Sequence, residues 1–136
     1  MIRSIIDAVC AKLAESFKDA EIYDEGVTQG LEEPCFFVRV ISPQLTKELA
    51  GRYRLDCPVI VQYYPKRDGE ENKSVIEASE RIFTVLEDIE VNGRIFHGNI
   101  SVEYPDDFLS ATATYECLLY SEGEAAEAME ELNIKI

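Results

Sequence analysis

The strongest constraint on the fold is a pair of runs near the C-terminal end in which apolar and polar residues alternate. In residues 99–104, and again in residues 111–119, every second side chain is apolar. Strict alternation is the pattern of a β-strand with one buried and one exposed face. Pro105-Asp106-Asp107 separates the two runs and is typical of a turn. The sequence therefore predicts an antiparallel hairpin here.

Two other segments carry apolar residues at helical spacing. Residues 2–17 place them at intervals of three and four, and the resulting stripe should lie on a sheet or on another helix. A second stripe covers residues 74–89. Ser74 and Glu77 match a capping box at its start, although the helix could also begin nearer Asn72. We therefore expect two long amphipathic helices.

Three further segments resemble strands. Residues 20–24 are a short candidate, and residues 35–41 are a strong one. Residues 58–64 are so apolar that they should lie in the centre of the sheet. The basic segment 44–55 is interpreted either as a projecting loop or as a short helix that leads into a strand. Asn92-Gly93 either ends the second helix or makes a tight turn.

This order of elements indicates one α+β domain. Short connections between neighbouring strands favour a mostly antiparallel sheet, with the two main helices packed on one face. A length of 136 residues suits a single domain, 1–136. Within it we expect a core over residues 1–120 and a C-terminal helical extension over 121–136, which is rich in Glu and Ala.

The chain is strongly acidic, with 27 Asp and Glu residues, 13 Lys and Arg residues and a formal net charge of −14. This charge argues against binding to a nucleic-acid backbone or to an anionic membrane. Solubility is the simplest explanation of the charge. The alternative is a surface that must repel polyanions. Met1 leads directly into the first helical pattern, so we expect no signal peptide.

The sequence contains little that could support catalysis. Its single histidine, His97, falls on a predicted strand, where a satisfied polar residue is the usual role. The carboxylate pairs lie in predicted loops, and no phosphate-binding, zinc-protease or serine-hydrolase motif is present. We therefore predict no catalytic residue, no metal ligand, no cofactor and no enzyme activity. The four cysteines lie in apolar segments without a C-x-x-C pair and are expected to be buried free thiols: Cys10, Cys35, Cys57 and Cys117.

Three pieces of the sequence together resemble a known family. They are the segment from Gln29 to Phe37, which reads QGLEEPCFF, the pair Arg52-Tyr53 before a strand, and Tyr63-Tyr64-Pro65 at the end of that strand. An acidic loop and the second helix follow. This order resembles the tail terminator, or tail completion, proteins of phages and prophages of Gram-positive bacteria. The resemblance covers residues 1 to about 120.

The resemblance implies a structural role in the virion. Tail terminators have helices packed on a sheet and typically form a six-membered ring on the end of the tail tube. The ring stops tube polymerisation and presents a surface to the neck or head, without a cofactor or a reaction. The implied partners are copies of the chain itself, the tail tube protein and a neck or head-completion protein. DNA would pass without specific binding, and no membrane is involved. The implied location is the virion tail, after assembly in the host cytoplasm.

Two charged segments are candidate contact sites within such a ring. The acidic loop with Asp68, Glu70 and Glu71 is a candidate lining of the DNA channel, because negative walls repel phosphate. The basic stretch with Lys47, Arg52, Tyr53 and Arg54 is predicted to meet an acidic patch on the neighbouring subunit. For both segments, the alternative is an ordinary exposed loop.

Two other functional interpretations stay open at this point. The chain could be another neck or head-completion protein of the same phage module. It could instead be a small non-catalytic module that binds a ligand or partner between helices and sheet, although such a module would have no reason to be so acidic. An enzyme would require two carboxylates, or a cysteine and His97, within hydrogen-bonding reach.

Overall fold

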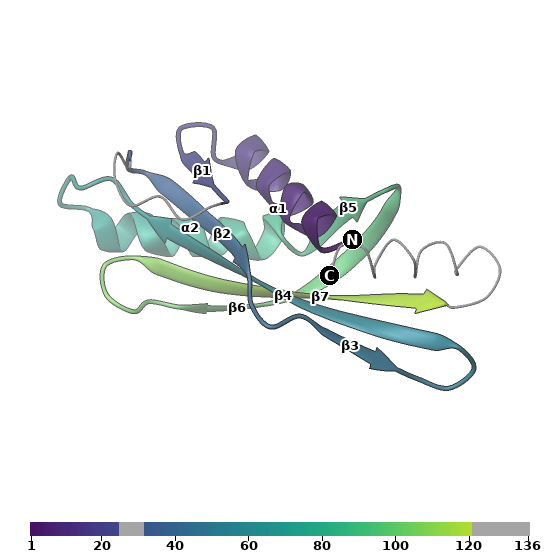
Figure 1. Ribbon diagram of the computed structural model, residues 1–136. Helices are drawn as coiled ribbons and strands as arrows, with labels where there is room; N and C mark the ends of the chain where they lie inside the picture. The colour runs from purple at the N-terminus through teal and green to yellow at the C-terminus, as the bar shows by residue number, and fades with distance from the viewer. Residues whose placement is uncertain (25–31, 121–136) are drawn as a thin grey trace.

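The computed structural model describes residues 1–24 and 32–120. The expected C-terminal extension over 121–136 lies outside these ranges, as do residues 25–31. Within them the chain forms two helices and seven strands, labelled in chain order in Figure 1. The elements are α1 (Ile2–Ser16), β1 (Glu21–Tyr23), β2 (Cys35–Val40), β3 (Gln44–Lys47), β4 (Arg52–Tyr64), α2 (Glu71–Val85), β5 (Asp88–Val91), β6 (Arg94–Glu103) and β7 (Leu109–Tyr120).

The strands form one curled sheet in the order β1-β2-β4-β7-β6-β5, and β3 pairs with β4 beside this path. The pairing of β1 with β2 is parallel, and the other pairings in the described residues are antiparallel. Figure 1 shows α1 and α2 on the same side of the sheet. The predicted α+β class is thereby confirmed, and the hairpin predicted around Pro105 is formed by β6 and β7.

The central strand, β4, is 13 residues long and organises the sheet. One of its edges pairs with β7 along nearly the whole strand. Its other edge is shared, because β2 pairs with residues 59–64 and β3 pairs with residues 53–56. Between these two ladders, the Ile41 N–H donates to the Pro58 carbonyl at 3.0 Å. β2, β3 and β4 therefore make one long hairpin that is interrupted at residues 41–43.

The start of α2 agrees with the predicted alternative nearer Asn72 and not with a start at Ser74. The helix begins at Glu71, and Glu70 occupies the N-cap position without a side-chain capping hydrogen bond. The predicted capping box of Ser74 and Glu77 is therefore wrong, since both residues lie inside the helix.

The end of α2 also comes earlier than the apolar pattern suggested. The helix stops at Val85, yet Leu86 and Ile89 remain buried in the same core from the connection and from β5. Asn92 and Gly93 adopt φ values of +52° and +80° and form the turn between β5 and β6. The tight-turn interpretation of this pair is confirmed, because two left-handed residues suit a two-residue hairpin turn.

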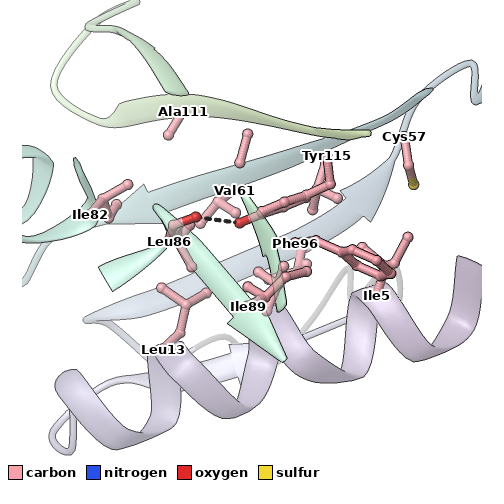
Figure 2. Close-up of a cluster of buried hydrophobic side chains, with 14 of the residues drawn as sticks. Ile5, Leu13, Cys57, Val61, Ile82, Leu86, Ile89, Phe96, Ala111 and Tyr115 are labelled. Carbon is pink, nitrogen blue, oxygen red and sulfur yellow. Dashed lines mark hydrogen bonds between the residues drawn. The ribbon is translucent and has the colours of Figure 1, made fainter. Parts of the chain in front are cut away.

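The core lies between the helices and the sheet. Ile5 and Leu13 of α1 point from the helix toward the strands (Figure 2). Tyr115 of β7 is fully buried, and its hydroxyl donates a hydrogen bond of 2.7 Å to the Leu86 carbonyl. This bond gives a partner to a polar group that would be costly to bury alone.

Candidate assembly surfaces

The basic segment 44–55 is a β-hairpin that extends away from the two helices (Figure 1). Its register runs from Gln44 opposite Asp56 to Lys47 opposite Tyr53. We call residues 44–56 the arm. The segment projects, but it forms a hairpin and is neither the predicted loop nor the predicted short helix, because ladder pairing with β4 requires an extended chain.

The arm brings together the four predicted interface residues but divides them between its two faces. Lys47 lies opposite Tyr53 and therefore on the same face. Tyr53 is half-buried and packs against the hydrophobic core. Arg52 and Arg54 flank Tyr53 in the strand and lie on the opposite face. The prediction that these residues contact a neighbouring subunit stays a prediction.

The two arginines of the arm already have acidic partners. Arg52 Nε donates to Glu48 Oε1 at 3.0 Å, and Arg54 Nη1 lies 3.2 Å from Glu48 Oε2. Arg54 Nε also donates to Asp56 Oδ2 at 3.1 Å, and this hydrogen bond raises the pKa of Arg54. Lys47 makes no ion pair with any residue in the described ranges.

The arm is nevertheless the basic part of an acidic chain. The arm contains three basic residues, Lys47, Arg52 and Arg54, and two acidic residues, Glu48 and Asp56. Its net charge is therefore +1. Because the whole chain carries −14, the residues outside the arm carry −15.

The turn of the arm presents an apolar side chain that sequence reasoning missed. Leu49 is 88% exposed, the largest value among the exposed large apolar residues described. Ala50 and Gly51 follow with φ values of +61° and +70°. A single exposed leucine is common on protein surfaces. Its position at the end of a projecting hairpin is the feature that distinguishes this one.

The predicted acidic loop follows the opposite end of β4. Asp68 Oδ1 accepts a hydrogen bond from the Glu70 N–H at 2.9 Å, and Glu71 Oε1 accepts one from the Gly69 N–H at 3.1 Å. Two of the three predicted carboxylates therefore shape the loop itself. Glu71 also lies in the first turn of α2, where a negative charge is favourable.

A depression of about 510 Å³ lies beside this loop, open to solvent. Arg67 pairs with Asp107 across the loop and lies 3.5 Å from Glu33 Oε2. The depression is lined by Gly69, Glu70, Glu71, Asn72, Lys73 and Asp107. Glu70 and Glu71 therefore share a surface, and the assignment of the acidic loop to a channel stays a prediction.

A third surface lies on the outer side of α2. Ile76 and Phe83, two turns apart, are 51% and 44% exposed although the sequence pattern placed both on the buried stripe. Tyr104, 50% exposed, lies beside them because its hydroxyl is 2.8 Å from Ser79 Oγ. Ser79 Oγ donates to the Ile76 carbonyl at 2.7 Å, so the tyrosine hydroxyl is the donor to Ser79.

The histidine and the cysteines of the described residues lie in different surroundings. His97 is exposed on β6 and pairs with Asp88 of β5. Burial raises the pKa of the Cys57 thiol to about 11, and burial also raises that of Cys10 to about 11. Within residues 1–24 and 32–120, no cluster of three or more His, Cys, Asp or Glu side chains could hold a metal ion. No helix in these ranges is long and apolar enough to cross a membrane.

Comparison with known proteins then places the chain. No curated protein matches it. A solved structure whose title names no function is 14% identical, with a TM-score of 0.38, and the match covers 81% of this chain and 92% of that one. That likeness is too weak to carry an argument.

The profile of a family described as phage tail terminator protein matches residues 4–127. The chain is therefore a structural protein of the phage tail, and its place is in the virion. It belongs to the phage tail terminator family, as the sequence resemblance indicated.

Proposed function

We propose that this protein caps the tail tube as a ring of identical subunits, stops polymerisation of the tube and offers the surface to which the head or neck is joined. Membership of the tail terminator family over residues 4–127 is the observation that carries this proposal. The family resemblance favours six subunits in the ring. The remaining partners would be the tail tube protein and a neck or head-completion protein.

The position of the two charged segments supports a head-to-tail ring. The arm leads into β4 at Arg52, and the acidic loop leaves β4 after Tyr64. At about 3.3 Å per residue, a strand of this length holds the two segments roughly 40 Å apart. The arm can therefore contact a neighbouring subunit while the loop faces the channel, and head-to-tail contacts of this kind close into a ring when the rotation allows.

The acidic charge supports a channel through which DNA passes without binding. We propose that Asp68, Glu70 and Glu71 face this channel, where carboxylates would repel the phosphate backbone. No cofactor takes part in this function. The chain would assemble in the host cytoplasm and remain in the virion tail. We further propose that residues 1–136 form one domain, with 121–136 as an extension of the core.

Electron microscopy of growing tubes tests the function directly. Purified tail tube subunits are polymerised with and without this protein, and tube lengths are measured in negative stain. We expect tubes that stop growing and carry a ring at one end when the protein is present. Light scattering on the protein alone gives its oligomeric state. Tubes that lengthen equally with and without it would contradict the terminator role.

A further inference from the structure

We propose that the tip of the arm docks on the outer face of α2 in a second copy of this chain. In this contact Leu49 packs against Ile76, Phe83 and Tyr104, and Lys47 lies near acidic side chains of α2. The inference rests on the proposed ring, for which it names the surfaces that meet. It assigns the contact to the exposed face of α2 and leaves the acidic loop free for the channel.

The face of α2 is suited to an apolar tip with a positive charge beside it. Ile76, Phe83 and Tyr104 are each about half-exposed, which is unusual for three large apolar side chains gathered on one side of a helix. Glu80 lies between the first two, four residues after Ile76 and three before Phe83. Glu80 is exposed and makes no ion pair within the described part of the chain.

The arm offers the complementary groups. Leu49 at its tip is 88% exposed, and Lys47 in the same hairpin lacks an acidic partner among the described residues. The arginines are held by Glu48 and Asp56, so Lys47 is the cation that is available without breaking an existing pair. One apolar residue and one free cation on the arm thus match an apolar cluster and a free carboxylate on α2.

A second copy is the occupant that these observations favour. The arm extends away from the helices at the end of β4 that is remote from the start of α2, so one molecule does not bring its own tip onto its own helix (Figure 1). The charge of +1 on the arm against −15 on the remainder favours contact between copies. A tail tube subunit on the α2 face is the competing occupant, and the experiment below distinguishes the two.

Cysteine cross-linking between two variants tests the contact. The full-length protein is prepared as Leu49→Cys and separately as Phe83→Cys, and the two are mixed on tail tubes and oxidised. We expect a disulfide-linked dimer in the mixture well above the level in either variant alone. Ile95→Cys replaces Phe83→Cys in the matched control, because Ile95 is also exposed but lies on β6 away from α2. The wild-type protein gives the background from the native thiols.

Exchanging charges between the arm and α2 tests the same contact through the strength of self-association. Lys47→Glu should weaken self-association roughly 5-fold at low salt, and adding Glu80→Lys should restore it. Leu49→Asp should weaken it by about 10-fold or more, because it places a charge in the centre of the contact. Leu49 and Lys47 are exposed, so these variants should fold like the wild type, which circular dichroism verifies.

The outcomes separate this inference from the proposed function. Tubes that are capped normally while Leu49→Cys and Phe83→Cys fail to cross-link would overturn the contact and leave the ring intact. Cross-linking of Phe83→Cys to the tube subunit in place of the second copy would also overturn it. Uncapped tubes in the presence of wild-type protein would remove the proposed function itself.

Discussion

Gly98 of β6 lies directly against the ring of Tyr115 on the neighbouring strand. The two residues are paired in the ladder, and a β-carbon built on Gly98 would be 2.6 Å from Tyr115 Cε1. The backbone of Gly98 therefore closes over the aromatic ring. Gly98 also stands where the pairing of β6 changes from β5 to β7, and its N–H donates to the Glu87 carbonyl at 2.8 Å.

Replacing Gly98 should destabilise the fold by steric overlap. In Gly98→Ala the new methyl group meets the Tyr115 ring, which is fully buried and has no room to withdraw. We expect a loss of about 1–3 kcal/mol in the free energy of unfolding, measured by urea denaturation. Asn99→Ala is the matched control, because Asn99 is exposed, and it should change stability by less than about 0.5 kcal/mol. Equal stability of Gly98→Ala and wild type would contradict the close packing.

The hydroxyl of Tyr115 should contribute measurably to stability. Tyr115→Phe keeps the ring but leaves the Leu86 carbonyl without its 2.7 Å donor in the core. We expect a cost of about 1–2 kcal/mol, since a buried acceptor loses its partner. Thermal unfolding followed by circular dichroism measures this cost. Tyr104→Phe serves as the comparison and should cost less, because Tyr104 is 50% exposed and the buried Ser79 hydroxyl keeps its bond to the Ile76 carbonyl.

The buried thiol of Cys57 should make the protein less stable at alkaline pH. Burial holds its pKa at about 11 in the folded chain, whereas an unfolded cysteine titrates near 8.5. The unfolded state therefore releases its proton first as the pH rises. Stability is fully present below about pH 8.5 and is lost between there and pH 11, by up to about 1.4 kcal/mol per pH unit for each such thiol.

Urea denaturation at several pH values checks the alkaline loss. In Cys57→Ala, the slope of unfolding free energy against pH above 8.5 should be shallower than in the wild type, whatever the absolute cost of the substitution. Cys10, Cys35 and Cys117, whose pKa values burial also raises, contribute to the slope that remains. An unchanged slope in Cys57→Ala would show that this thiol titrates alike in both states.

The ion pairs of the arm should matter more for association than for folding. Glu48→Gln removes the carboxylate shared by Arg52 and Arg54, yet exposed pairs of this kind contribute less than about 1 kcal/mol. We expect the melting temperature to change by no more than a few degrees. Because the substitution also raises the charge of the arm from +1 to +2, self-association should become stronger at low salt and more sensitive to added salt. Sedimentation at two ionic strengths measures both effects.

The sequence alone is sufficient to predict the strands that have one buried face and one exposed face. β7 alternates strictly between core and surface, so its position was readable from residue types alone. β3 gave no such signal, because all four of its residues are exposed and its strand conformation depends on pairing with β4. Residue types alone therefore predict only a loop or a short helix for this segment.

The extent and facing of α2 were harder to predict for a different reason. Its apolar stripe contains two adjacent rows, one with Val75 and Ile82 and one with Ile76 and Phe83. A helix turns only one of these rows toward the sheet. In α2 the first row is buried and the second is exposed. The continuation of the pattern through Ile89 reflects a shared core, which the following strand enters after the helix has ended. The width of the stripe was the signal that an exposed apolar face was present.

The length of β4 has a geometric consequence for assembly. In a ring that uses the arm at one end of each subunit and the helix-covered body at the other, the length of β4 sets the distance between these two contacts. It therefore sets how far each subunit extends around the ring. Inserting two residues into each strand of the arm would preserve the alternation of faces and extend the reach by about 7 Å per subunit. The central opening of the ring would then widen, and the ring would fit a tail tube of larger diameter.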